Sequence, residues 1–371
     1  MTREKMPDSV KHTYKPVCKP ISVKARRLIV KAISSFIPVG SWRRAFRSRF
    51  IEDRTFHPFY GRIYSPYYYP EPFLEGEPDI YNRRGEKMHM YFIRDWHGAS
   101  DPYSLRHNGL PPTKFLWDRF NFGLKTHFYV HKAMLETMGH PDRRYGMLLE
   151  SRAIAARDYE LFKRHKGLAD EFDAVFTYDA QILESVKCAK FFPHYAAPWY
   201  GMEQGGGVSD PAAFEHKTKG VSIVSSNKRM CHYHDYRIGL ARQCRREGLA
   251  DAYGTFDGGS MVKIAKALKD YRFSIIVEND ISPYFFTQKI TDCFMAMTVP
   301  VYFGATKIGE FFNEDGIIRI KPGDDLRKVL AACTEREYES RLPAILDNYN
   351  RVQQYRNMWD WLYNKYLTES K

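Results

Sequence analysis

The sequence has few cysteines and no long apolar run. Its six cysteines are scattered among 371 residues, without the C-x-x-C spacing of a zinc site or the density of a disulfide scaffold. No apolar stretch approaches the about 20 residues of a membrane-spanning helix, and the first residues, MTREKMPDSV, lack the apolar core of a signal peptide. These absences predict reduced thiols, no structural zinc, and a location in the cytoplasm or at the inner face of the cytoplasmic membrane.

An even spread of positive charge is also missing. The formal net charge is +13, but residues 1–50 hold 13 Lys and Arg against 2 Asp and Glu, which leaves 44 against 42 for the remainder. A nucleic-acid-binding protein usually spreads its basic residues over the folded domain, so this distribution argues against a nucleic acid as partner.

Basic and apolar residues alternate at helical spacing within this N-terminal segment. An apolar stripe runs from Ile21 through Ile29 and Ile33 to Phe36, and SWRRAFRSRF then adds Trp42 and Phe46 among four arginines. The pattern predicts that residues 21–49 contact an anionic membrane surface. A basic helix packed on the protein's own body, or a solvated tail, would give the same pattern.

The remaining chain has the pattern of an α/β fold. Short apolar runs alternate with longer helical patterns from about residue 86, which is typical of parallel strands joined by helical crossovers. The predicted strands are Met88–Ile93, Tyr145–Leu149, Ala174–Phe176, Val221–Val224, Ala250–Tyr253, Phe273–Val277, Val299–Phe303 and Ile317–Ile320.

The polar, Gly-rich stretch at residues 202–220 divides this pattern into two comparable halves. It neither follows a strand nor carries the Lys-Ser/Thr of a phosphate loop, so a hinge between domains is the better interpretation. The predicted organisation is a basic segment (1–50), a Pro/Tyr-rich linker (51–85), a first α/β domain (86–205), a second α/β domain (216–330) and C-terminal helices packing on the body (331–371).

Ligands of parallel sheets bind at the carboxyl ends of the strands, so the residues that follow each predicted strand are the candidates for a site. They include Asp95, Glu150, Tyr178, the run Ser225-Ser226-Asn227, Glu278-Asn279 and Gly304.

Two strand-loop-helix-strand units in the second half favour an anion. Thr287 can cap a helix that carries Gln288 and Lys289 in its first turn, beside unpaired backbone N–H groups. Arg237 lies in the first turns of the corresponding helix of the other unit, and a guanidinium binds a diphosphate through two donors. The alternative is that Lys289 is a solvated lysine on a surface helix.

These motifs together resemble the donor-binding signature of the α-1,3-fucosyltransferases, glycosyltransferase family 10. The resemblance covers residues 86–325. It rests on Glu278-Asn279, Thr287-Gln288-Lys289, Thr298-Val299-Pro300-Val301 with Gly304, Ser225-Ser226-Asn227-Lys228 with Arg237, and YGMLLESRAI and FDAVFTYDAQIL in the first half.

The resemblance implies a GT-B architecture, in which two Rossmann-like domains face each other across a cleft and the second domain holds a sugar nucleotide such as GDP-fucose. Arg237 and Lys289 would bind the diphosphate and Gln288 would meet the ribose. The donor pocket would further include Glu278, Asn279, Ser226, Asn227, Lys228 and Gly304. Glu150 would be the catalytic base, which takes the proton of an acceptor hydroxyl in an inverting transfer. No metal and no further cofactor would be required.

Two positions depart from the family pattern, and both concern the donor. Gln288 replaces the usual Glu, and its neutral amide makes weaker hydrogen bonds to ribose hydroxyls than a carboxylate does. Phe285 stands where Tyr is common. The alternative to a catalytic role for Glu150 is a structural one, in an ion pair with Arg152 or Arg157.

The acceptor is predicted only as a surface glycan of lipopolysaccharide or capsule type, and the candidates to contact it are Asp95, Trp96, His97 and Tyr178. Two other functions stay open. One is a metal-dependent GT-A transferase in which Glu278 and Asp280 hold Mn²⁺. The other is a non-catalytic glycan- or lipid-binding protein that retains the fold, for which the only motive is Gln288.

Overall fold

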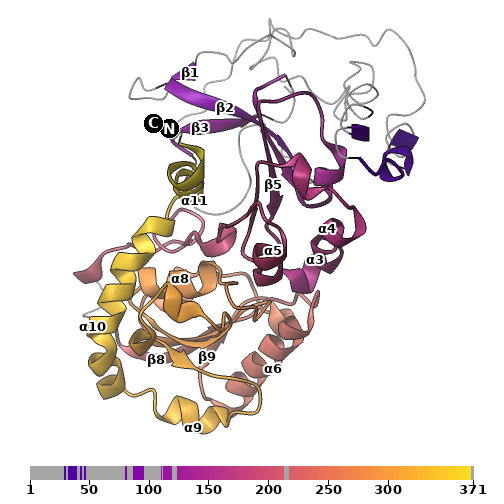
Figure 1. The fold of residues 1–371 in the computed structure, drawn as a ribbon. Coiled ribbons are helices and arrows are strands. Elements are labelled where there is room, and N and C mark those ends of the chain that lie inside the picture. The colour runs from indigo at the N-terminus through magenta and orange to yellow at the C-terminus, as the bar shows by residue number, and fades with distance from the viewer. Residues whose placement is uncertain are drawn as a thin grey trace, which may run out of the picture.

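The computed structural model has two α/β domains and a helical C-terminus (Figure 1). It describes residues 29–30, 32–39, 42–43, 46, 80–81, 87–95, 110, 112–118, 123–212 and 217–368. Among these residues, none of the helices combines the length and apolarity needed to cross a bilayer.

The N-terminal domain is built on a seven-stranded sheet. The strands pair in the order β3-β2-β4-β5-β6-β7 and are parallel, while β1 pairs with β2 in the antiparallel sense. Among the parallel strands β2 comes first in the chain, with β3 on one side of it and β4 on the other, so the strand order reverses between β2 and β4. The strands are β1 (Ile80–Tyr81), β2 (Lys87–Arg94), β3 (Phe115–Asp118), β4 (Thr126–Val130), β5 (Arg143–Leu148), β6 (Ala174–Thr177) and β7 (Ala189–Phe191).

Short helices follow the strands of this domain. The longest of them, α3, begins after β5 and lies at the edge that faces the second domain (Figure 1). Asp179 caps α5 by accepting a hydrogen bond from the Ile182 amide, and it also binds the guanidinium of Arg152 in α3. The helices are α3 (Arg152–Tyr159), α4 (Leu161–Arg164), α5 (Ala180–Ser185), η3 (His131–Glu136), η4 (Ala169–Glu171) and η5 (His194–Ala196).

The C-terminal domain has a five-stranded, fully parallel sheet in the order β12-β11-β10-β8-β9. Its first strand, β8, lies beside both the second and the third, so the strand order reverses between β8 and β10. In doubly wound sheets this reversal opens a crevice at the carboxyl ends of the two strands. The strands are β8 (Lys219–Val224), β9 (Asp251–Tyr253), β10 (Tyr271–Val277), β11 (Val299–Phe303) and β12 (Ile318–Arg319).

One helix follows each of the strands β8 and β10. Helix α6 (His232–Glu247) follows β8 and ends at Gly248, whose φ of 64° is the left-handed conformation that glycine adopts readily. Helix α8 (Gln288–Met295) follows β10, and Thr287 caps it as predicted by accepting from the Lys289 amide. The other helices are α7 (Ala265–Leu268), α9 (Leu326–Ala331), α10 (Glu335–Val352), α11 (Met358–Leu362), η7 (Phe256–Gly258), η8 (Ile308–Glu310), η9 (Glu314–Gly316), η10 (Gln353–Tyr355) and the π-helix η11 (Tyr363–Leu367).

The C-terminal helices contact both domains. The Tyr338 hydroxyl in α10 donates to the Met297 carbonyl of the second domain at 2.8 Å. Trp359 in α11 packs against Trp117 of the first domain, with ring centroids 5.2 Å apart, and Asp360 accepts hydrogen bonds from Thr113. The pair α10–α11 therefore ties the two domains together (Figure 1).

The predicted α/β class is confirmed, and all eight predicted strands are present with small differences at their ends. Sequence patterns missed β1, β3, β4 and β7. Strands β1 and β7 are only two and three residues long, which is too short for a period to be visible. β1 is also an exception to the expected parallel arrangement.

A buried carboxylate of α8 fixes the segment that leaves the first domain. One oxygen of Asp292 accepts hydrogen bonds from the amides of Trp199 and Tyr200, at 2.6 and 2.8 Å. Burial raises the pKa of Asp292 to about 7, against the opposing effect of these two hydrogen bonds. Between about pH 4 and pH 7 the folded state therefore holds a proton that the unfolded state has released, so rising pH destabilises the fold.

We expect Asp292→Asn to remove this pH dependence, since the amide keeps the acceptor oxygen but carries no charge. The variant should be more stable than the unchanged protein at about pH 8, by up to roughly 4 kcal/mol, and the difference should shrink at about pH 5. Thermal unfolding at several pH values measures this. Asp235→Asn, at an exposed position, is the control. If the stability of Asp292→Asn depends on pH as that of the unchanged protein does, Asp292 is not the group responsible for that dependence.

Candidate active site

The strand-order reversal of the second sheet lies among the residues predicted as a donor site. Ser225, Ser226 and Asn227 follow β8, and Glu278 and Asn279 follow β10. The next helices, α6 and α8, begin at the same edge of the sheet, so their N-terminal N–H groups add a positive potential there.

A buried carboxylate organises the N-terminus of α8. Glu278 has no exposed surface, and its oxygens accept hydrogen bonds from the Thr287 amide at 2.9 Å, the Thr287 hydroxyl at 2.9 Å and the Lys289 ammonium at 2.9 Å. The Lys289 side chain remains 22% exposed. Glu278 therefore acts on the site by fixing Lys289, and a direct contact with a ligand does not fit its burial.

Gly304 supports this arrangement from the end of β11. A Cβ atom at this position would lie 2.7 Å from the Glu278 side chain and 2.2 Å from the Tyr302 hydroxyl, which is closer than real contacts allow. Any larger residue would displace the carboxylate. The structure thus places Gly304 behind Glu278, as a packing position.

Arg237 is a buried cation with incomplete hydrogen bonding. Its side chain donates one hydrogen bond to the Ser226 hydroxyl at 3.2 Å, and its Nε has no partner among the described residues. Burial lowers the pKa of Arg237, while the nearby Glu278 carboxylate opposes that effect. A buried guanidinium with an unused donor is suited to bind an anion.

The predicted cations all affect one side chain, that of His234. Burial lowers the pKa of His234 most, and the positive charges of Arg237, Lys289 and Lys228 lower it further. The Asn279 side chain opposes this shift. The charges of Lys228, Arg237 and Lys289 thus act on one side chain, at the strand-order reversal of the second sheet.

The remaining predicted donor residues lie at the rim of this cluster. Asn227 and Lys228 are exposed, and the Asn227 amide donates to the Thr255 hydroxyl at 3.1 Å. Gln288 is half-buried in the first turn of α8. Its contact with a ribose stays a prediction.

Glu150 follows β5 and is half-buried at the carboxyl end of the first sheet. One of its carboxylate oxygens accepts a hydrogen bond from the Ser151 amide at 2.7 Å. The Tyr195 hydroxyl also interacts with this carboxylate, which together with the larger effect of burial raises the pKa of Tyr195.

The proposed ion pair between Glu150 and Arg152 is not formed. The Arg152 guanidinium instead binds both oxygens of Asp179, at 2.6 and 2.7 Å. The Glu150 carboxylate is therefore not neutralised by Arg152.

His131, which sequence reasoning missed, holds the backbone of Glu150. Its Nε2 accepts hydrogen bonds from the Glu150 amide at 2.9 Å and the Leu149 amide at 3.2 Å, and its Nδ1 lies 3.2 Å from Asp158. Because Nε2 accepts these hydrogen bonds, the ring N–H is on Nδ1, the nitrogen nearer Asp158. His131 has a φ of 54°, a conformation in which a side chain other than glycine is uncommon.

Loop residues between β10 and α8 bring the two domains into contact at this place. Asp280 accepts a hydrogen bond from the Ala153 amide of α3 at 3.3 Å, and the Phe285 ring packs 4.6 Å from that of Tyr178. Glu150 and the cationic cluster therefore belong to segments that touch each other across the domain junction.

The metal-binding alternative does not fit these contacts. Glu278 is occupied by Thr287 and Lys289, while Asp280 accepts from the amides of Ala153 and Ser282. The two carboxylates thus serve different partners. In the described part of the chain, no three His, Cys, Asp or Glu side chains are grouped so that they could hold a metal ion.

The predicted acceptor residues have different outcomes. Tyr178 needs correction, because it is 3% exposed and its hydroxyl accepts a hydrogen bond from the Arg152 amide, so it is part of the domain junction. Asp95 is half-buried at the end of β2, beside the strand-order reversal of the first sheet. Trp96 and His97 lie outside the described residues.

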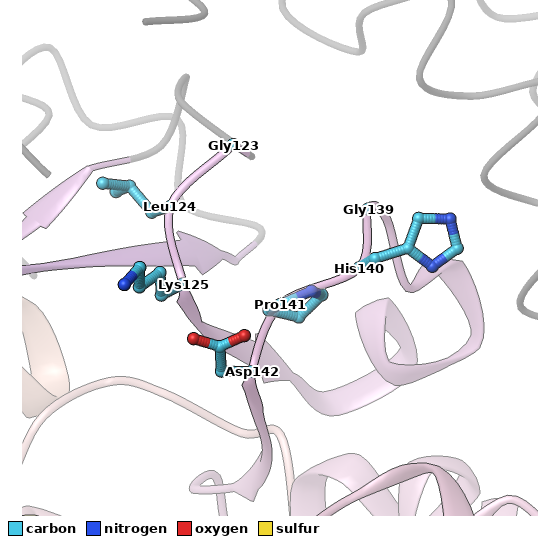
Figure 2. A pocket seen from close by; sticks show the side chains of 7 residues that line it. All are labelled: Gly123, Leu124, Lys125, Gly139, His140, Pro141 and Asp142. Carbon is cyan, nitrogen blue, oxygen red and sulfur yellow. The ribbon is translucent and has the colours of Figure 1, made fainter. Parts of the chain in front are cut away.

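A pocket at the other end of the first sheet is separate from this site. It lies between the segments that precede β4 and β5, which is the amino end of both strands (Figure 2). Its lining consists of Gly123, Leu124, Lys125, Gly139, His140, Pro141 and Asp142. Parallel α/β folds bind their ligands at the opposite edge, so this pocket is not a candidate for the active site.

The two doubly wound domains meet at the carboxyl ends of their strands, which is the arrangement of a GT-B fold. Residues 214–337 match the family model described as glycosyltransferase family 10 (fucosyltransferase), C-terminal. The resemblance predicted from the motifs is thereby confirmed for residues 214–337, about a third of the chain. No curated protein gives a significant match.

Several solved structures are distantly similar to the chain. An alpha1,3-fucosyltransferase with GDP-fucose has 13% identity and a TM-score of 0.43, covering 74% of this chain and 90% of that one. Another structure of an alpha1,3-fucosyltransferase has 15% identity and a TM-score of 0.42, covering 71% and 80%. An Anabaena protein in complex with UDP-glucose has 13% identity and a TM-score of 0.42, covering 64% and 76%.

We expect Arg237→Ala to weaken the binding of GDP, because the variant loses the buried guanidinium of the cationic cluster. Hydrogen bonds to charged groups contribute about 1.5–3 kcal/mol, which corresponds to roughly 10- to 100-fold in affinity. Calorimetric titration with GDP measures the loss. Arg246→Ala, on the same helix at an exposed position, is the matched control and should bind normally. Equal affinities of the two variants would contradict the role of Arg237.

Proposed function

We propose that this chain is an inverting glycosyltransferase that transfers fucose from GDP-fucose to a hydroxyl of a surface glycan. The observation that carries the proposal is the position of Arg237, Lys289 and Lys228 in the segments that follow β8 and β10, at the strand-order reversal of a domain that matches family 10. The fucosyltransferase description of that family supports fucose as the sugar, and the resemblance of the donor motifs supports GDP as the nucleotide.

Fixed positive charge suits the departure of a diphosphate. When the bond between the sugar and the diphosphate breaks, negative charge grows on the leaving oxygen. Arg237, Lys289 and the N-terminus of α8 are held in place by buried contacts, so they can stabilise this charge without reorganising. In this proposal these groups neutralise the diphosphate, and the reaction needs no divalent metal.

Glu150 takes the other role in the transfer. Its carboxylate removes the proton of the acceptor hydroxyl as that oxygen attacks the anomeric carbon from the face opposite the diphosphate. One new carbon–oxygen bond forms, the bond to the diphosphate breaks with its electron pair leaving on GDP, and the configuration at the anomeric carbon is inverted. Glu150 suits this role because Arg152 is bound to Asp179 instead.

The two substitutions in the donor motifs have different meanings in the structure. Phe285 packs on Tyr178 at the domain junction, so the absence of a hydroxyl there is compatible with its surroundings. Gln288 begins α8 and offers an amide where the family pattern has a carboxylate. We propose that it still binds the ribose, with weaker hydrogen bonds.

We expect Glu150→Gln to bind GDP normally and to transfer fucose at least about 100-fold more slowly, because an amide cannot accept the proton of the acceptor. GDP release from GDP-fucose, measured with a panel of glycan acceptors, gives the rate, and linkage analysis identifies the product. Glu184→Gln, an exposed residue of the same domain, is the control. If the unchanged protein neither binds GDP nor turns over GDP-fucose, the proposed function is wrong. If it binds GDP without turnover, it is a binding protein.

We also expect substitutions of His131 to change kcat more than the KM for the donor, since His131 positions Glu150 and does not reach the cationic cluster. Asn tolerates the left-handed backbone and offers an acceptor oxygen, whereas Leu offers none. His131→Leu should therefore lower kcat about tenfold or more, and His131→Asn should retain more of it. Steady-state kinetics with both variants tests this. Equal losses in the two variants, or a loss confined to KM, would rule out the positioning role.

A further inference from the structure

The N-terminal segment packs on the first domain through one side only. The N-terminal segment comprises the described residues between 29 and 46 and includes a short helix at residues 29–30 and 32–35. Val30 and Ser34 are buried, at 3% and 1% exposed. Arg43 is also buried, where it donates to the Lys166 carbonyl at 3.0 Å and lies 3.6 Å from the Glu171 carboxylate. The segment lies beside the first domain in Figure 1, in indigo.

The other side of the N-terminal segment is apolar and exposed. Five of the ten large hydrophobic side chains that are exposed in the described part of the protein belong to it, although it contributes few of the described residues. They are Ile29 (50% exposed), Ile33 (46%), Phe36 (85%), Val39 (41%) and Trp42 (68%). Exposed apolar side chains concentrated in one place are typical of an interaction surface.

A buried amphipathic helix would have its apolar stripe covered by the protein, and here that stripe is exposed. The predicted apolar stripe included Ile29, Ile33 and Phe36, and these side chains are exposed, whereas Val30 and Ser34 are buried. The segment is thus packed on the body, as one sequence alternative held, but its apolar stripe has no partner among the described residues. An interaction partner outside the described residues would explain why this apolar stripe is exposed.

We propose that the N-terminal segment docks on an anionic membrane surface, with Phe36 and Trp42 inserting among the lipids. The charge of the sequence selects this occupant. Residues 21–49 contain eight Lys and Arg and no Asp or Glu, and of these Arg43 pairs with Glu171 inside the protein. Aromatic side chains flanked by basic residues are the combination that binds at the interface of an anionic bilayer.

The alternative occupants fit less well. A nucleic acid would use the positive charge but would gain little from exposed Ile29, Ile33 and Phe36. A second copy of the chain would bury the apolar side chains but would bring two strongly basic segments together, which costs Coulomb energy.

Docking of this kind would hold the enzyme at the inner face of the cytoplasmic membrane, next to a glycan acceptor anchored there. That consequence rests on the proposed function. The docking itself does not, because it uses neither the cationic cluster nor Glu150.

The test is cosedimentation of the full-length protein with vesicles. Vesicles of equal parts phosphatidylcholine and phosphatidylglycerol should bind the protein, vesicles of phosphatidylcholine alone should bind it weakly, and high salt should release it. The double variant Phe36→Ser with Trp42→Ser should bind the anionic vesicles roughly tenfold or more weakly.

A matched control uses two equally exposed positions of the second half of the chain. Met261 is 85% exposed and Val208 is 71% exposed, close to the values of Phe36 and Trp42. Met261→Ser with Val208→Ser should bind vesicles as the unchanged protein does. Thermal unfolding of all variants shows that each is folded, and vesicle binding by an unchanged protein that binds no GDP would count against the proposed function alone.

Three results would overturn the docking proposal. One is that the unchanged protein does not sediment with anionic vesicles. Another is that the Phe36 and Trp42 variant binds them as strongly as the control. The third is that the unchanged protein is a dimer in ultracentrifugation and the variant a monomer, which would assign the surface to a second copy.

Discussion

The site depends on one buried negative charge, the carboxylate of Glu278. A carboxylate without exposed surface is stable only if its oxygens are fully hydrogen-bonded and its charge is balanced. Thr287 and Lys289 meet both requirements, and Gly304 leaves the space in which the carboxylate lies. As a result the Lys289 ammonium is fixed at the start of α8, where the helix N-terminus and Arg237 add to its field. The Lys289 ammonium is therefore held in position before a ligand binds.

The same loop that begins at Glu278 joins the two halves of the molecule. Asp280 binds the first turn of α3, and Phe285 packs on Tyr178, so the cationic cluster is connected to the segment that carries Glu150. Asp292 and the pair α10–α11 add two further ties between the domains. His131 then fixes Glu150 from within the first domain. Each reacting group is therefore held by buried contacts rather than by exposed side chains.

Sequence reasoning located most of the second domain because its signals are local. A strand followed by Glu278-Asn279 and a helix capped by Thr287 can be identified from spacing alone. It missed His131, whose importance comes from the pairing of β4 with β5 and from a left-handed backbone that no periodicity indicates. It also assigned Tyr178 to the acceptor because the residue follows a strand, whereas packing against Phe285 decides its role. The outward direction of Ile33 and Phe36 likewise depends on which side of the helix meets the protein, which a hydrophobic pattern does not determine.

The most direct test of this account is the structure of the protein in complex with GDP. The account predicts that the diphosphate lies between the Arg237 guanidinium and the Lys289 ammonium, with the unpartnered Nε of Arg237 now donating to a phosphate oxygen. The Glu150 carboxylate should lie across the domain junction, facing the terminal phosphate. A diphosphate bound elsewhere, or one that contacts neither Arg237 nor Lys289, would contradict the central claim.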